Sequence, residues 1–132
     1  MEKIKTLAMV DDDPLFIMLT EQVVRETRMV EQMLTFSNGP DLLSFLEDNT
    51  DQPDELPEMI LLDLNMPMMD GWEFLEEFLL LLPRLKKDIR ICVLTSSISP
   101  VDQQRAKAIS AVYDYVVKPV SEERFAGIVQ SL

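Results

Sequence analysis

The chain of 132 residues contains no histidine and only one cysteine. Without histidine it can carry neither a phosphohistidine nor a Ser-His-Asp triad, so any histidine chemistry has to come from a partner. Cys92 cannot form an internal disulfide, and its position inside an apolar run predicts a small buried core residue rather than a reactive thiol. A metal site in this chain would therefore use oxygen ligands.

Basic residues are scarce. Twelve lysines and arginines stand against 24 acidic residues, which gives a formal net charge of −12. This charge disfavours direct binding to nucleic-acid phosphates or anionic membranes and suits cations and basic partner surfaces. No apolar run is long enough to cross a bilayer, and no secretory signal is visible. We expect one cytoplasmic domain over residues 1–132, without an output domain and without membrane insertion.

Five short apolar runs alternate with segments of helical pattern along the chain. The runs cover residues 5–10, 33–36, 59–62, 89–94 and 112–117. Buried strands of a parallel sheet have continuous apolar sequences, and an alternation of strands and helices implies right-handed crossovers. The predicted fold class is therefore α/β, a doubly wound parallel sheet with helices on both faces.

Capping residues mark the expected start of each helix. Asp13 precedes Pro14, which is a favoured residue at the first helical position, so Asp13 is predicted to be an N-cap rather than a ligand. Leu15, Leu19 and Val23 recur at helical spacing and predict the core face of a helix over 14–27. The other helices are expected to begin near Asn38, Asp70, Ser99 and Ser121, and the third to run over 71–82.

Polar residues directly follow four of the apolar runs. Ligands of open α/β sheets bind outside the carboxyl ends of the strands, so these residues are expected to share one crevice. Clustered carboxylates resist ionisation unless a cation neutralises them, and oxygen ligands suit Mg²⁺. The residues concerned are Asp11, Asp12, Asp13, Asp63, Thr95, Ser96, Ser97 and Lys118.

These motifs, in this order, resemble the receiver domain of two-component response regulators, of the single-domain type. The resemblance spans essentially the full chain and rests on residues 10–14, 62–71, 94–96 and 115–119. It implies a flavodoxin-like (βα)5 fold with strand order 2-1-3-4-5. It also implies a signalling switch that receives a phosphoryl group from a partner histidine kinase or His phosphotransfer protein. The face made by the fourth helix, fifth strand and fifth helix would then bind a downstream protein or form a homodimer.

The resemblance makes Asp63 the phosphorylated residue and a metal ligand. Mg²⁺, or Mn²⁺ in its place, would also be held by Asp12, by the backbone carbonyl of Asn65 and, through water, by Asp11. The cation would neutralise the repulsion between the attacking carboxylate and the phosphoryl group. The carboxylate needs no general base, because it is ionised at neutral pH. Such a protein promotes its own phosphorylation and dephosphorylation and is not a turnover enzyme on a separate substrate.

The remaining site residues come from the last two motifs. Lys118, Thr95 and Ser96 would bind the phosphoryl group, with Lys118 acting as a point charge. Thr95 and Tyr115 would form the switch, in which the hydroxyl of Thr95 moves toward the phosphoryl oxygens and opens space for the Tyr115 ring. A surface tyrosine is the alternative for Tyr115. The resemblance also implies a cis peptide bond between Lys118 and Pro119.

Two further functions remain open at this point. The first is an Mg²⁺-dependent phosphohydrolase that uses Asp11 and Asp13 as a D-x-D pair, although the chain has no cap elements to enclose a substrate. The second is a constitutive docking module that has lost phosphorylation. Independently of these, Ser97 and Asn65 are hypothesised to tune the access of water to the acyl phosphate.

Two segments depart from the expected pattern. Residues 74–82 are more apolar than one core face requires, which indicates either a deeply covered helix or an exposed patch for a partner. Many receivers carry a glycine before the fifth strand, whereas this chain has none at residues 108–112. The geometry of that turn therefore does not follow from the resemblance.

Overall fold

A computed structural model describes residues 3–132 of the chain. Strands and helices alternate throughout, as the apolar runs predict. The elements are β1 (Ile4–Val10), α1 (Pro14–Thr27), β2 (Val30–Phe36), α2 (Gly39–Asp48), β3 (Met59–Leu62), α3 (Gly71–Leu81), the short 3-10 helix η1 (Leu82–Arg84), β4 (Arg90–Thr95), α4 (Pro100–Lys107), β5 (Val112–Val117) and α5 (Glu122–Gln130).

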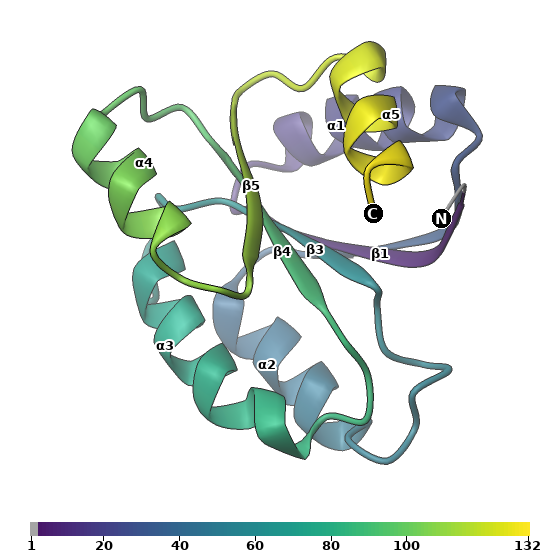
Figure 1. Cartoon of the computed structure of the whole chain (residues 1–132), viewed down its shortest axis with the longest axis vertical. Coiled ribbons are helices and arrows are strands. Elements are labelled where there is room, and N and C mark those ends of the chain that lie inside the picture. Colours follow the sequence, from purple (N-terminus) through teal and green to yellow (C-terminus); the bar gives the residue numbers. More distant parts are fainter. Residues whose placement is uncertain (1–2) are drawn as a thin grey trace.

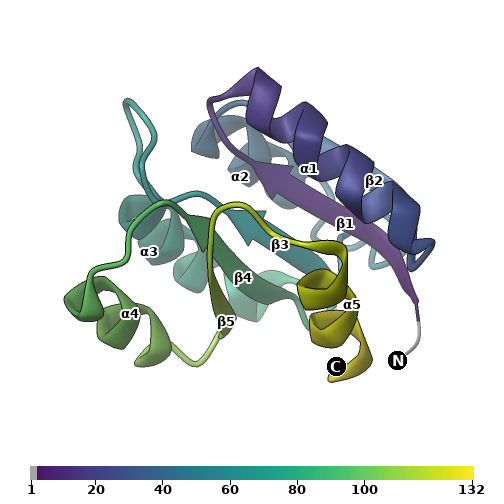
Figure 2. The ribbon, with the colours of Figure 1, turned by 90° about the horizontal axis from the view of Figure 1, so that it is seen from above.

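The five strands form one parallel sheet in the order β2-β1-β3-β4-β5, which Figure 2 shows in a view turned by 90° from Figure 1. Helices α1 and α5 cover one face, and α2 and α3 cover the other (Figure 1). Because neighbouring strand residues point to opposite faces, Ala8 packs with α2 and α3 while Leu7 packs with α1 and α5. The predicted (βα)5 fold and strand order are confirmed.

The core face predicted for α1 is wrong in detail. Leu15 and Leu19 are 59% and 49% exposed, whereas Thr20 and Val24 are buried and Val23 is partly buried. Apolar residues surround the first two turns of this helix, so the spacing alone allows more than one stripe. The position of α1 over the sheet and beside α5 selects the stripe through Thr20 and Val24.

Strand β2 begins at Val30, three residues before the apolar run at 33–36. It lies at the edge of the sheet and pairs only with β1 among the described residues. An edge strand with one partly solvated face accommodates polar residues such as Glu31 and Gln32. Its start therefore lacks the continuous apolar character that identifies the central strands.

The apolar segment 74–82 is largely a covered helix. Phe74, Leu75, Phe78 and Leu81 are buried in the core between α3 and the sheet. Two leucines of α3, Leu79 and Leu80, are exposed, at 39% and 75%. The segment therefore supplies core residues rather than a broad apolar surface. No helix within residues 3–132 combines the length and the apolarity that crossing a membrane requires.

The turn before β5 closes without glycine. The backbone N–H of Ile109 donates to the carbonyl of Ala106 at 3.0 Å, and that of Val112 donates to the carbonyl of Ile109 at 3.0 Å. Among the described residues, only Arg28 and Met68 have a positive φ outside glycine. This turn thus uses ordinary backbone conformations, and the absence of glycine requires no strain.

Candidate functional site

The carboxyl ends of β1, β3 and β5 bring Asp11, Asp63 and Lys118 together. Lys118 Nζ lies 2.8 Å from Asp11 Oδ2 and 3.5 Å from Asp63 Oδ1. The backbone N–H of Lys118 donates to the carbonyl of Thr95 at 2.7 Å, which fixes the end of β5 beside that of β4. Residues far apart in the sequence meet here because parallel strands end at the same edge of the sheet.

Three carboxylates share this edge. Oxygen atoms of Asp11, Asp12 and Asp63 all lie within 4.8 Å of one another. Asp11 and Asp63 are buried, at 1% and 4% exposure, while Asp12 is exposed. Hard divalent cations prefer such an all-oxygen set, so these residues fit Mg²⁺ or Mn²⁺. Asn65 is exposed and contributes its backbone N–H, which donates to Asp63 Oδ1 at 3.3 Å.

The pKa of Asp63 is raised from 3.8 to about 6, chiefly because burial removes water from its carboxylate. The negative charge of Asp11 raises the pKa further, whereas Lys118 and the N–H of Asn65 lower it. Most of the Asp63 population is still ionised at pH 7. One ammonium group therefore only partly offsets three carboxylates, and a bound cation would lower the pKa of Asp63 again.

Asp13 is the N-cap of α1, as predicted. Its side chain accepts hydrogen bonds from the backbone N–H groups of Leu15 and Phe16 at 3.0 and 3.3 Å. Its own N–H donates to Asp11 Oδ1 at 2.9 Å and so orients the buried carboxylate. The side chain of Asp13 caps the helix and is not part of the carboxylate cluster, so of the D-x-D pair in the phosphohydrolase hypothesis only Asp11 belongs to the cluster.

The hydroxyl residues connect the site to α4 and β5. Thr95 is fully buried, and its Oγ1 accepts the backbone N–H of Ser97 at 3.2 Å. The Ser97 hydroxyl donates to Asp102 Oδ2 at 2.7 Å, which occupies its only donor. Tyr115 is buried, and its hydroxyl donates to the carbonyl of Ser97 at 2.9 Å, so it is no surface tyrosine. Ser96 is exposed.

Two close contacts complete the surroundings of Asp63 and Lys118. At Gly71 a Cβ atom would lie 2.7 Å from the carbonyl oxygen of Asp63, so only glycine lets α3 begin this close to the end of β3. Lys118 Nζ lies 4.2 Å from the centre of the Phe16 ring. Sequence reasoning missed Phe16, although its place in the first turn after the acidic run was a signal.

The Lys118-Pro119 peptide bond is cis.

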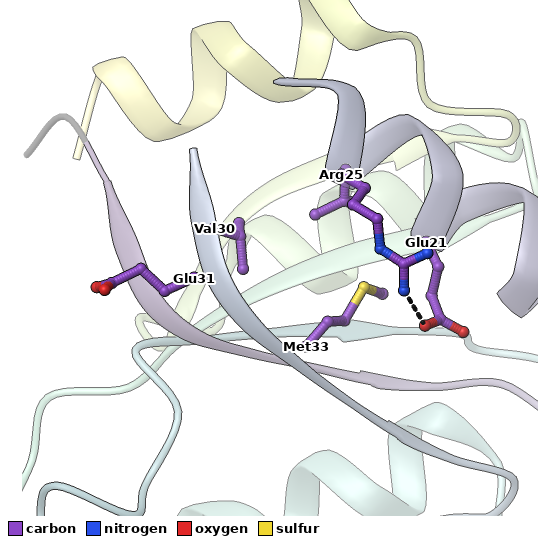
Figure 3. Close-up of a pocket in the computed structure, with 6 residues that line it drawn as sticks. Glu21, Arg25, Val30, Glu31 and Met33 are labelled. Atoms are coloured by element: carbon purple, nitrogen blue, oxygen red, sulfur yellow. Dashed lines mark ion pairs between the residues drawn. The ribbon is translucent and has the colours of Figure 1, made fainter. Parts of the chain in front are cut away.

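A separate hollow of about 140 Å³ lies between α1 and the edge strand β2 (Figure 3). Figure 3 shows the ion pair between Arg25 and Glu21 at its rim, with a separation of 3.6 Å. Arg25 is 80% exposed, so this pair is worth little in free energy. None of the residues predicted for the site lines the hollow, and it carries no part of the proposed chemistry.

Comparisons with known proteins agree with the fold described above. The response regulator receiver domain family matches residues 7–130. A two-component response regulator from Cytophaga hutchinsonii is 29% identical, with a TM-score of 0.89 over 98% of this chain and 96% of that one. The Mn²⁺-bound form of response regulator Rcp1 is 27% identical, with a TM-score of 0.73 over 96% of this chain and 90% of that one.

One curated relative is much longer than this chain. The sensor histidine kinase CheAY of Helicobacter pylori is 30% identical over 98 residues, which are 74% of this chain but 11% of the kinase. The similarity therefore concerns one part of a larger protein.

Proposed function

Since the chain belongs to the response regulator receiver domain family, we propose that it is a phosphorylation-controlled switch with Asp63 as the phosphoacceptor. The observation that carries the proposal is the buried Asp63 carboxylate beside Lys118 and within the cluster that contains Asp11 and Asp12. This arrangement places a nucleophile, a phosphate-binding cation and candidate metal ligands at one edge of the sheet.

The proposed reaction is transfer from a phosphohistidine of a histidine kinase or a phosphotransfer protein. A carboxylate oxygen of Asp63 bonds to phosphorus while the phosphorus–nitrogen bond breaks, and the electron pair of that bond returns to the imidazole. Lys118 supplies positive charge to the phosphoryl oxygens, and the fixed strand ends hold the nucleophile in place. The residues that would hold Mg²⁺ are Asp12, Asp63, Asn65 through its backbone carbonyl and, through water, Asp11. The cation would supply positive charge against the repulsion between nucleophile and phosphoryl group.

The proposed switch depends on the hydrogen bonds that link Thr95 to Ser97 and Ser97 to Tyr115. A phosphoryl group on Asp63 offers acceptors to the Thr95 hydroxyl, which now accepts the N–H of Ser97. Movement of Thr95 would shift Ser97 and with it the bond between Tyr115 and the carbonyl of Ser97. The face of α4, β5 and α5 would change in consequence, altering the binding of a downstream protein or of a second copy. We place this activity in the cytoplasm.

Asn65 is the stronger candidate for control of hydrolysis. It is exposed beside Asp63, whereas the Ser97 hydroxyl is bonded to Asp102. A bulky residue at position 65 should restrict water and lengthen the lifetime of the acyl phosphate. An unchanged dephosphorylation half-life in an Asn65→Met variant would contradict this role.

Intact-protein mass spectrometry tests the proposed function. The protein is incubated with a small phosphodonor and Mg²⁺, with EDTA as the metal control. Asp63→Asn is compared with Asp88→Asn, which removes a carboxylate that is 85% exposed. We expect one phosphoryl adduct in the wild type and in Asp88→Asn, and none in Asp63→Asn or with EDTA.

The other outcomes identify the alternatives. An adduct that persists in Asp63→Asn would assign the chemistry to another residue. An unmodified wild-type protein that is folded and binds Mg²⁺ would favour the docking module or a site that requires its own kinase. Continuous release of phosphate from a small ester would favour a phosphohydrolase.

A further inference from the structure

Lys118 has a third neighbour besides the carboxylates of Asp11 and Asp63. Its ammonium nitrogen lies 4.2 Å from the centre of the Phe16 ring, within the range of a cation–π interaction. The Lys118 side chain is 19% exposed, so the ring and the two carboxylates together replace much of the water that would otherwise surround the ammonium. The ring thus contributes to the orientation of the lysine.

The backbone fixes Phe16 at this place. Its N–H is bonded to the side chain of Asp13, the N-cap whose own N–H binds Asp11. The ring is partly buried against the core below α1 and α5. It also lines a hollow of about 50 Å³ together with Pro119, the residue after the lysine. One short segment therefore sets the positions of the acidic residues and of the ring.

An aromatic face differs from a carboxylate as a partner for Lys118. A carboxylate engages an N–H donor of the ammonium and adds a full negative charge to a site that already has three acids. The ring attracts the ammonium through its quadrupole and adds no net charge. Consequently the ring can keep the Lys118 ammonium in place while an N–H of the lysine leaves Asp11 and donates to an incoming phosphoryl group.

We propose that Phe16 is a positioning residue for phosphoryl transfer, which keeps the Lys118 ammonium aimed at the phosphoryl site by a cation–π contact. The inference rests on the proposed function and adds a residue to its machinery. It predicts that an aromatic residue is required at position 16 for its electrons as well as its volume. Phe16→Tyr and Phe16→Trp should retain the contact, and Phe16→Leu should lose it.

The test is a series of singly and multiply fluorinated phenylalanines incorporated at position 16. Fluorine withdraws electrons from the ring face but nearly preserves its shape. We expect the rate constant for phosphorylation by a small phosphodonor to decrease steadily with the number of fluorines, to a loss of about threefold to tenfold. Phe16→Leu should lose a similar factor, and Phe45→Leu, a matched change at a partly buried ring of α2, should lose none.

A second measurement needs neither metal nor phosphodonor. The ring current of Phe16 should shift the NMR signals of the Lys118 ε-methylene protons, and the shift should vanish in Phe16→Leu but remain in Phe45→Leu. A normal shift in the wild type would overturn the contact. A phosphorylated wild type whose rate is the same throughout the fluorine series would overturn the positioning role. A wild type that accepts no phosphoryl group, yet shows the ring-current shift, would refute the proposed function while supporting the hold of Phe16 on Lys118.

Discussion

Two ion pairs lie at opposite ends of the same sheet and are built differently. At the amino end, Glu58 Oε2 and Lys87 Nζ are 2.8 Å apart, with side chains 15% and 20% exposed. At the carboxyl end, Lys118 lies 2.8 Å from Asp11 and 3.5 Å from Asp63. The first pair matches one acid with one base, whereas the second leaves an excess of acid.

The amino-end pair also satisfies backbone groups. Glu58 Oε1 accepts N–H groups from two residues of β1, at 2.6 and 3.3 Å. Lys87 Nζ donates to the carbonyls of Pro53 and Leu56, both at 2.8 Å. The pair therefore fastens the loop between α2 and β3 to the sheet, which is a structural task.

The carboxyl-end cluster holds more acidic than basic groups. Burial raises the pKa of Asp63, and the negative charge of Asp11 raises it further. An arrangement of this kind lowers the stability of the free protein, and under the proposed function a bound cation would offset the excess negative charge. At the amino end, the pair supports the fold through its bonds to backbone groups, whereas an excess of buried acids at the carboxyl end is typical of a site for a ligand.

The largest expected effect is a difference in phosphorylation rate between variants of Lys118 and Lys87. Lys118→Met should slow phosphorylation by about 100-fold, because the phosphoryl oxygens lose their direct cation. Lys87→Met should phosphorylate at nearly the wild-type rate, since Lys87 belongs to the amino end. Intact-protein mass spectrometry with one phosphodonor gives both rates. Equal rates in the two variants would contradict the phosphate-binding role of Lys118.

Next in size is a pH-dependent effect of Asp63→Asn in metal-free buffer. The folded-state pKa of about 6 exceeds the unfolded value of 3.8, so ionisation of Asp63 favours the unfolded state as pH rises between these values. The variant should be more stable than the wild type by about 2–3 kcal/mol above pH 6, and the margin should shrink as the pH falls and vanish below about pH 3. Urea unfolding across pH measures it, and a margin independent of pH would contradict the raised pKa.

At the amino end, Lys87→Met should lower the free energy of unfolding by about 2 kcal/mol. The substitution leaves Glu58 partly buried without its counter-charge and frees two carbonyls, and partial exposure reduces the loss below that of a fully buried pair. Urea denaturation at pH 7 provides the value. A loss below a few tenths of a kcal/mol would mean that this pair does not hold the loop.

The smallest expected effect is a change in the free energy of unfolding, with opposite signs at the two ends of the sheet. Asp12→Asn removes one of the clustered acids and should stabilise the metal-free protein by about 1 kcal/mol while weakening Mg²⁺ binding. Glu58→Gln removes the only acid of its pair and should destabilise the protein by a similar amount. Thermal unfolding with and without Mg²⁺ compares the two, and destabilisation by both substitutions would remove the distinction between the ends.

The central strands and their terminal residues were predictable from the sequence for a physical reason. Strands buried on both faces are continuously apolar, so the ends of β1 and β3 are visible and place Asp11 and Asp63 at one edge. The partly solvated edge strand β2 has no such pattern, and its first residues, from Val30, were missed.

Side-chain orientation was less predictable than position. The helical spacing of Leu15, Leu19 and Val23 predicts a core face for α1, but packing against the sheet selects the stripe through Thr20 and Val24. The contacts of Phe16 with Lys118 and of Ser97 with Asp102 depend on rotamers fixed by tertiary structure. The sequence alone therefore predicts which residues meet at the carboxyl edge of the sheet, but not the side-chain contacts that they make.

Locating the phosphoryl group is the most direct test of this account. The protein is phosphorylated with a small phosphodonor and Mg²⁺ and then treated with borohydride, which reduces an acyl phosphate to an alcohol, and the modified residue is identified from fragment masses. The account predicts reduction at Asp63 alone, dependent on Mg²⁺. Reduction at Asp11, Asp12 or any other acid, with Asp63 unmodified, would contradict it.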